Sequence, residues 1–378
     1  MPKLLLPSGH TWAFVDANPD GRTTLLCLHG FPDLSYGYWH QIGPWARAGF
    51  RVVVPDMLGY GGSDAPVDPA QYTTKRLAAD LAALLTLLGV ARAVVIGHDW
   101  GSFTAGRFAL WHPERVLALV LMSVPFTPAA RGPVALETIA QHAPNLAYQL
   151  YLASPAAAPT IEADILYFLG LAFAPPHAPV DFTPRGALAA FLASPPSPAA
   201  AAQMPSVLTP AERALYCAAF RARGMTGPTN YYRTTHLRGA EERGSPSATS
   251  TSNPKPGALT LPPVPVLALY GTRDPTITPA ALAGQRRTIP PQQLTERAME
   301  GAGHWVLLVE ESGSGSATTD AGAGKSSGSD VADPLAPWRT AVSTGAWKRE
   351  SGTGGEVGRV VLEWLAGVGI QGGDKARL

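Results

Sequence analysis

Short runs of branched apolar residues alternate with longer helix-like stretches along much of the chain. The runs are continuous, which is typical of parallel strands buried on both faces of a sheet. Strands separated by helical stretches predict crossovers within one open sheet. We therefore expect an α/β fold with a mostly parallel central sheet. The predicted strands are residues 25–28, 52–54, 94–96, 117–122 and 264–270.

The clearest predicted helix lies between the second and third of these strands. From residue 74 to residue 88, leucine recurs at helical spacing, so that one stripe of the helix faces the core. Thr73 or Thr74 precedes the run as a helix cap, and Gly89 ends it. Residues 356–365 carry a similar stripe, which predicts the final helix of the core.

The alternation stops between residues 125 and 238, where Ala, Pro and aromatic residues dominate and helix-like pieces replace strands. These pieces are residues 135–151, 161–171, 187–192 and 210–223. Because a strand pattern returns at Val264, we expect a helical cap inserted into one α/β domain rather than two domains in series. The predicted division is a first core part over 1–125, the cap over 126–238, a linker loop over 239–257 and a second core part over 258–378.

Two segments have low complexity. Residues 239–257 and 312–355 are rich in Gly, Ser and Thr and cannot bury enough apolar surface to offset the entropy of ordering. We expect both to be mobile loops, the second as a disordered insertion in the core. It contains residues 324–328, which formally match a serine-nucleophile motif. Since no strand precedes them and no helix follows, we reject that site.

The net charge and the cysteines exclude several classes of protein. A net charge of +1 without basic runs gives no electrostatic footprint for nucleic acid or for an anionic membrane. Cys27 and Cys217 form no disulfide framework and no metal-ligand spacing, which fits a reducing, cytoplasmic compartment. No apolar segment reaches the roughly 18 residues of a membrane span. We therefore expect a soluble protein without a metal site.

The last three residues of the sequence resemble a targeting signal. Ala376-Arg377-Leu378 has the small-basic-leucine form of a peroxisomal tripeptide, which works only when the tail is exposed. A chance ending is the alternative. Peroxisomal import therefore stays beside the cytoplasm as a second prediction for localisation.

The third predicted strand leads directly into Gly97-His98-Asp99-Trp100-Gly101, and a helix-like run follows. Small residues on both sides suit a side chain displayed at a sharp strand-to-helix turn. Many hydrolases carry serine at this position and need a base to activate it. An aspartate is already ionised at pH 7, so Asp99 can attack carbon unaided. Because the motif is short, the alternative is that Asp99 is an ordinary turn residue without a catalytic role.

Three further segments offer partners for Asp99 at predicted strand ends. Residues 29–33 directly follow the first strand, and their backbone can donate to an oxyanion. Asp274 follows the last strand and can orient a histidine, while His304 lies farther on in a glycine-rich loop that suits a base. The order nucleophile, acid, histidine is that of the α/β-hydrolases.

Each residue alone has a simpler interpretation. A lone histidine such as His304 is more often a surface or a satisfied core residue, Asp274 before Pro275 can simply start a turn, and His29 can cap a strand. Their joint occurrence in this order favours a catalytic triad.

With these motifs the chain resembles the α/β-hydrolase superfamily and, within it, the epoxide hydrolases. The resemblance rests on residues 29–32, 56–64 and 97–101 together with Asp274 and His304, and it spans nearly the whole chain outside the two low-complexity segments. Two cap segments sharpen it. Residues 148–151 look like the segment that bears the first cap tyrosine of the family, and residues 230–233 look like the segment that bears the second.

The resemblance implies a two-step addition of water to an epoxide, without a metal or an organic cofactor. Asp99 would attack a ring carbon while Tyr151 and Tyr232 donate hydrogen bonds to the ring oxygen. His304, oriented by Asp274, would then activate water against the ester. The oxyanion would be held by backbone N–H groups of Phe31 and Trp100, in a binding site that also includes His29. The small-molecule epoxide and water are the expected partners.

Two questions stay open at the level of sequence. Tyr148 and Tyr231 lie close to the favoured tyrosines, and any of the four can be a packing aromatic. Haloalkane dehalogenases share the aspartate, the histidine and a tryptophan after the nucleophile, so Trp100 does not discriminate, although a leaving halide needs no cap hydroxyl. A catalytically silent ligand-binding protein of the same fold is the third alternative.

Overall fold

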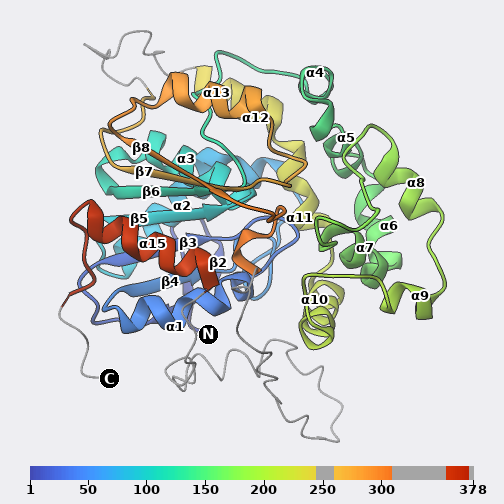
Figure 1. Cartoon of the computed structure of the whole chain (residues 1–378), viewed down its shortest axis with the longest axis horizontal. Helices are drawn as coiled ribbons and strands as arrows, with labels where there is room; N and C mark the ends of the chain where they lie inside the picture. Colours follow the sequence, from blue (N-terminus) through green and yellow to red (C-terminus); the bar gives the residue numbers. More distant parts are fainter. Residues whose placement is uncertain (244–258, 309–354, 374–378) are drawn as a thin grey trace, which may run out of the picture.

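A computed structural model of the chain describes residues 1–243, 259–308 and 355–373. Its centre is one eight-stranded sheet in the order β1-β2-β4-β3-β5-β6-β7-β8 (Figure 1). The strands β3 to β8 run parallel, whereas β1 and β2 are antiparallel to their neighbours, which confirms the mostly parallel sheet. The strands are β1 (Lys3–Leu5), β2 (Thr11–Ala17), β3 (Thr24–Leu28), β4 (Arg51–Pro55), β5 (Ala93–His98), β6 (Val116–Met122), β7 (Val266–Gly271) and β8 (Leu294–Met299).

The five strands predicted from apolar runs are β3 to β7, and their side chains are almost all buried. Three further strands were not predicted. The edge strand β8 is only partly buried and its sequence, Leu294–Met299, contains charged residues, so it lacks the continuous apolar run of a central strand. An edge strand has one neighbour and one open side, which removes the pattern used for prediction.

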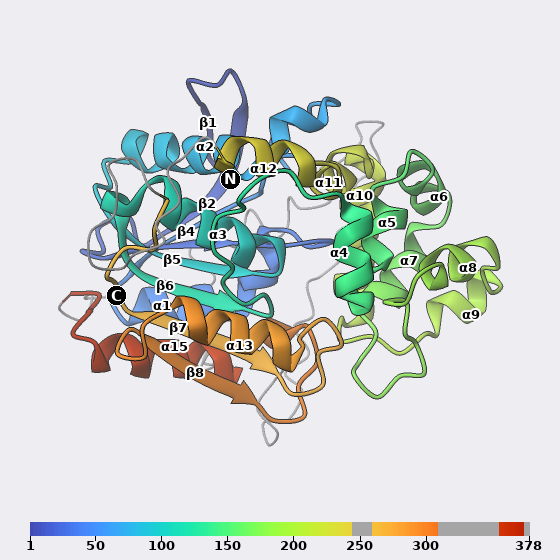
Figure 2. The ribbon, with the colours of Figure 1, turned by 90° about the horizontal axis from the view of Figure 1, so that it is seen from above.

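Helices cover both faces of the sheet. Figure 2 separates the two layers, with α2 on one side of β5 and β6 and with α1 and α15 on the other. The predicted helix after Thr73 is α2, and the Thr73 hydroxyl accepts a hydrogen bond from the Arg76 N–H at its start, as an N-cap residue does. The core helices are α1 (Trp39–Arg47), α2 (Thr74–Leu87), α3 (Trp100–Trp111), α13 (Pro279–Thr288) and α15 (Gly355–Gly367).

Between β6 and β7 the chain forms a group of helices beside the carboxyl ends of the strands, and the last described helix of this stretch returns to the core, where it contacts α2 (Figure 1). The predicted helix over 135–151 is divided in the structure, because Pro144 begins a 3-10 turn between α4 and α5. These helices are α4 (Leu136–His142), α5 (Tyr148–Leu152), α6 (Ala157–Ala163), α7 (Ile165–Ala172), α8 (Ala187–Ala193), α9 (Pro198–Ala202), α10 (Pro210–Arg223), α11 (Thr226–Asn230) and α12 (Thr235–Arg243), with a 3-10 helix, η5 (Tyr231–Arg233), before α12.

Helix α12 ends at Arg243, so residues 239–243 are helical, whereas the sequence predicts that the linker loop starts at Gly239. Most of that predicted linker, most of the low-complexity segment 312–355 and the C-terminal tripeptide lie outside the described residues. No helix within the described ranges is long and apolar enough to cross a membrane. Cys27 and Cys217 are both buried and free.

Candidate active site

Asp99 sits at the turn between β5 and α3 in an unusual backbone conformation. Its φ is 53° and its ψ is −121°, a combination that L residues rarely adopt. The neighbouring backbones approach so closely that a Cβ at Gly97 would collide with the carbonyl of Gly101, and one at Gly101 would collide with the carbonyl of Leu28. The two glycines therefore permit the sharp turn that presents the carboxylate, as the sequence predicts.

Each oxygen of the Asp99 carboxylate has a different partner. The Phe31 N–H donates to Oδ1 at 2.8 Å, and His304 Nε2 lies 3.4 Å from Oδ2. Burial raises the pKa of a carboxyl group, but the hydrogen bond and the charge of His304 outweigh it and leave the pKa of Asp99 below its ordinary value. Asp99 is therefore a buried but ionised carboxylate.

His304 bridges the two aspartates. Its Nδ1 lies 2.9 Å from Oδ2 of Asp274, while its Nε2 faces Asp99. Burial opposes the charged imidazolium, yet Asp274 and Asp99 together raise the pKa of His304 to about 10. The three residues that the sequence predicts as a triad thus meet in one charged chain at the ends of β5, β7 and β8.

Asp274 is held in place by a turn that the sequence reasoning did not single out. Its Oδ1 accepts hydrogen bonds from the N–H of Thr276 at 2.8 Å and from the Thr276 hydroxyl at 2.7 Å. This leaves Oδ2 for the histidine. The signal was available in the sequence, because an aspartate often accepts bonds from the residue two positions on.

The backbone of His304 is anchored as well. Its carbonyl lies 2.8 Å from His98 Nε2 and accepts a hydrogen bond from the Ser123 hydroxyl at 2.8 Å. Burial lowers the pKa of His98 to about 4, so the ring is neutral and its Nε2–H can donate. No sequence pattern points to this contact, since the three residues come from three different strand ends.

His29 lies beneath the site rather than at its surface. Its Nε2 accepts a hydrogen bond from the Met57 N–H at 2.9 Å, and its Nδ1 lies 3.0 Å from the Gly30 carbonyl. Burial lowers its pKa to about 4. The neutral ring therefore shapes the loop that carries Phe31 and is not among the residues that line the cavity.

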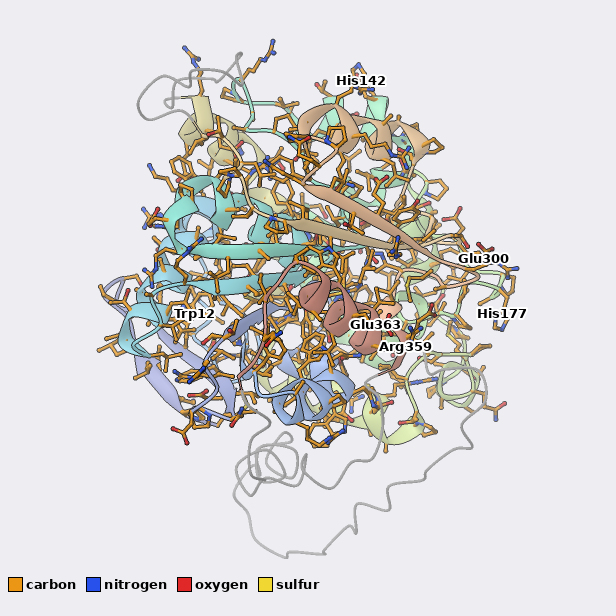
Figure 3. The ribbon with its side chains drawn as sticks, turned by 60° about the vertical axis from the view of Figure 1, so that its left-hand side comes forward. Trp12, His142, His177, Glu300, Arg359 and Glu363 are labelled. Atoms are coloured by element: carbon orange, nitrogen blue, oxygen red, sulfur yellow. The ribbon has the colours of Figure 1, made fainter. Side chains whose placement is uncertain are left out.

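A cavity of about 970 Å³ opens above Asp99, between the strand ends and the cap helices. Its wall is largely apolar where cap residues form it, and the core residues Glu300 and Arg359 also belong to the lining. Figure 3 labels these two residues, which follow β8 and lie on α15, respectively. The lining includes Phe31, Asp99, Tyr148, Leu152, Phe168, Leu171, Val180, Phe182, Leu188, Val207, Tyr232 and His304.

Two cap tyrosines line this cavity, and they are Tyr148 and Tyr232. Their rings meet edge to face, with centroids 6.4 Å apart. Burial, reinforced by the charge of Asp99, raises the pKa of both hydroxyls, so they stay protonated and can donate hydrogen bonds.

The structure places the other two candidate tyrosines elsewhere. Tyr151 follows Tyr148 on α5 and does not line the cavity. Leu152, the next residue along, does line it, so the wall is formed by the side of α5 that carries Tyr148 and Leu152. Tyr231 donates its hydroxyl proton to the carbonyl of Leu58 and does not line the cavity. Position 148, which the sequence offers as the neighbour of the favoured Tyr151, is thus the one at the cavity.

Trp100 starts helix α3 directly after Asp99. Its indole ring packs edge to face against Tyr232, with centroids 5.2 Å apart, and against Phe103, with centroids 5.6 Å apart. The side chain is not among the lining residues. Its backbone N–H, at the first position of the helix, is a free donor by helix geometry.

The chain matches known proteins over most of its length. The family model described as "alpha/beta hydrolase fold" matches residues 23–311. Epoxide hydrolase A of Mycobacterium tuberculosis is 31% identical over 310 residues, which are 80% of this chain and 91% of that protein. The chain belongs to the epoxide hydrolase family.

Solved structures of epoxide hydrolases have the same fold. Epoxide hydrolase A from Mycobacterium thermoresistibile superposes with a TM-score of 0.64 at 29% identity, covering 81% of this chain and 92% of that one. An epoxide hydrolase from an endophytic Streptomyces gives a TM-score of 0.63 at 29% identity, covering 81% and 90%. The α/β-hydrolase core and the family predicted from sequence are therefore confirmed.

Proposed function

We propose that this epoxide hydrolase family member opens an epoxide through a covalent ester on Asp99 and then hydrolyses the ester to a vicinal diol. The observation that carries the proposal is one cavity that holds an ionised carboxylate and two protonated hydroxyls, those of Tyr148 and Tyr232. A nucleophile and proton donors in the same cavity are what ring opening requires.

The first step forms a bond from Oδ2 of Asp99 to a ring carbon and breaks that carbon's bond to the ring oxygen. The departing electron pair stays on this oxygen, which takes its proton from Tyr148 or Tyr232. Oδ1 is already engaged by the Phe31 N–H, so it becomes the carbonyl oxygen of the ester. The cap tyrosines act in this step because an alkoxide is a poor leaving group unless it receives a proton.

In the second step His304 removes a proton from water, and the hydroxide attacks the carbonyl carbon of the Asp99 ester. The negative charge moves to Oδ1, where the N–H groups of Phe31 and Trp100 stabilise it. The acyl–oxygen bond then breaks and His304 returns the proton to the product oxygen. The proton left on the regenerated carboxyl group of Asp99 passes by way of solvent to the tyrosinate formed in the first step, and the diol leaves. Asp274 keeps the imidazole oriented and stabilises its charge throughout.

A panel of epoxides and haloalkanes tests this reaction against its alternatives. We expect diol from the epoxides and no halide from the haloalkanes, because two hydroxyl donors serve an oxygen leaving group. The Asp99→Ala variant should lose turnover by about 10⁴-fold or more, as is usual for loss of a nucleophile. Release of halide would favour a dehalogenase. Binding of the epoxides without formation of diol would favour a ligand-binding protein. An active Asp99→Ala variant would refute the mechanism.

The domain division and the localisation remain proposals from sequence. We infer that residues 126–238 act as the cap domain, which supplies both hydroxyls to a triad in the core. The C-terminal tripeptide, residues 376–378, supports peroxisomal import, and the remaining composition supports the cytoplasm. Attaching the last residues of the chain to a fluorescent protein, with and without Leu378, decides between the two compartments.

A further inference from the structure

A buried ion pair lies where the chain passes between core and cap. Arg107, on the core helix α3, places Nε 2.7 Å from Oε1 of Glu242 on α12. Arg107 is 3% exposed and Glu242 is 1% exposed. Neither residue lines the cavity, so the proposed reaction does not use them directly.

The ion pair contacts both segments that connect the core to the cap, namely the segment after β6 and the returning helix α12. The guanidinium of Arg107 donates to the carbonyls of Thr127 and Pro128, in the segment that leaves β6 for the cap, at 2.7 and 3.2 Å. Glu242, in the helix that returns from the cap, also accepts a hydrogen bond from the Ala130 N–H. One arginine and one carboxylate therefore join the outgoing segment and the returning helix to α3.

The two connections also touch through their backbones. Gly239 of α12 lies so close to Gly132 and Pro133 that a Cβ at position 239 would collide with them. Close contact of two backbones leaves little freedom for α12 to slide against the outgoing segment. The ion pair and this contact together fix α12 relative to α3.

A row of aromatic rings leads from this pair to the cavity. The guanidinium groups of Arg107 and Arg238 lie 4.4 and 4.6 Å from the ring centre of Phe103. Phe103 packs against Trp100, and Trp100 packs against Tyr232. Tyr232 itself lies in η5, immediately before α12. The position of α12 and the position of the Tyr232 hydroxyl are thus linked both by the chain and by packing.

We propose that Arg107 and Glu242 are positioning residues that set the Tyr232 hydroxyl over Asp99 by fixing the returning helix α12. The proposal rests on the proposed function, because it assigns the pair to the ring-opening step. Removing the pair should slow ring opening and leave hydrolysis of the ester unchanged. A purely structural pair would affect both steps alike or neither.

The double variant Arg107→Met/Glu242→Met is the main test, since replacing both charges by apolar side chains leaves no unpaired charge in the interior. Its control is Arg286→Met/Glu296→Met, which removes an ion pair between α13 and β8. Ring opening is measured in a His304→Gln background as the rate at which the protein gains the mass of the epoxide. Ester hydrolysis is measured with His304 present, as the decay of that mass.

We expect the Arg107/Glu242 variant to slow ring opening about tenfold or more, because small displacements of a catalytic group have effects of this size. Ester decay should stay within about twofold of the parent, and the control pair should change neither rate. Combined with Tyr232→Phe, the variant should add little further loss, since it acts through that hydroxyl. Ring opening within about twofold of the parent, or an equal loss in both steps, would overturn the proposal.

Arg107→Lys covers the case in which the double variant does not fold. Lysine keeps a positive charge beside Glu242, but a single ammonium cannot replace the fork that reaches Thr127, Pro128 and Glu242 together. We expect the same selective loss of ring opening, and an unchanged rate would refute the positioning role. If the parent protein itself forms no ester, the proposed function fails, and the role of the pair fails with it.

Discussion

In the core, Asp99, Asp274 and His304 each follow one of the parallel strands of the sheet. In the cap, Tyr148 and Tyr232 lie on helical pieces of five and three residues. The core residues are joined directly by the histidine. The cap tyrosines are held by rings and by the packing of short helices against the core.

The difference shows two ways of placing a reactive group. The carboxyl ends of parallel strands meet at one edge of a sheet, so a residue at such an end is placed by the sheet itself. A residue on a short cap helix is placed by contacts between elements, and a change in any of them can move it. We therefore expect changes in the core to affect the ester and its hydrolysis, and changes in the cap to affect ring opening.

Among the changes that separate the two steps, the largest effect should come from His304→Gln. Glutamine cannot take a proton from water, so diol formation should fall by about 10³-fold or more, while Asp99 still opens the ring. Intact-protein mass spectrometry should show the mass of the epoxide retained on the protein. A variant that forms diol at the parent rate, or that never gains mass, would contradict the separation of the two steps.

The cap comes next, with three tyrosine variants. Tyr148→Phe and Tyr232→Phe should each slow ring opening by about 10²-fold, as loss of one donor to a developing oxyanion does. Tyr151→Phe is the matched control on the same helix and should change the rate by less than about twofold, since it lies off the cavity. Single-turnover mass measurements give the rates. A large loss with Tyr151→Phe and none with Tyr148→Phe would reverse the assignment.

Acid should separate the two steps without any substitution. Burial opposes the charged form of His304, but Asp274 and Asp99 together raise the pKa of its imidazole to about 10. Formation of the ester removes the negative charge of Asp99 and so lowers the pKa of His304 again. Hydrolysis needs the neutral imidazole and therefore slows as the pH falls below that lowered pKa. Ring opening needs ionised Asp99, whose pKa is below its ordinary value, and persists. The fraction of protein carrying ester should rise toward acid pH, and a falling fraction would contradict this order.

The smallest effect should come from a helix cap that is not itself part of the cavity wall. Thr209 forms a capping box with Glu212 at the start of the cap helix α10, and Thr209→Ala should cost about 1 kcal/mol of the free energy of unfolding. Ring opening should stay within about twofold of the parent. Urea titration and single-turnover rates measure the two quantities. A loss of rate without a loss of stability would show that α10 positions a cap tyrosine.

The meeting of Asp99, Asp274 and His304 was predictable because its signals are local. Asp99, Asp274 and His304 each follow a strand or a glycine-rich loop that can be recognised from neighbouring residues, and the parallel sheet then brings them together. The carboxylate turn at Asp99 also depends on Gly97 and Gly101, which are visible in the sequence.

The cap tyrosines were less predictable because Tyr148 and Tyr151 lie three residues apart on one short helix, and this spacing does not show which ring reaches the cavity. The division of the predicted helix at Pro144 shifts where α5 begins, and only the packed structure shows which ring reaches the wall. The bond from His98 to the His304 carbonyl and the pair of Arg107 with Glu242 join residues far apart in sequence. Contacts of this kind leave no periodic pattern.

The N–H of Phe31 donates to only one oxygen of Asp99, so the two oxygens of the carboxylate have different fates during turnover. If Oδ1, which accepts the hydrogen bond from Phe31, stays on Asp99, then Oδ2 leaves with the diol and an oxygen atom from water takes the place of Oδ2. The oxygen atom that each diol takes from Asp99 is therefore one that entered the carboxylate from water in the preceding turnover. In heavy-oxygen water the first product of each molecule of protein would be light, and every later one heavy.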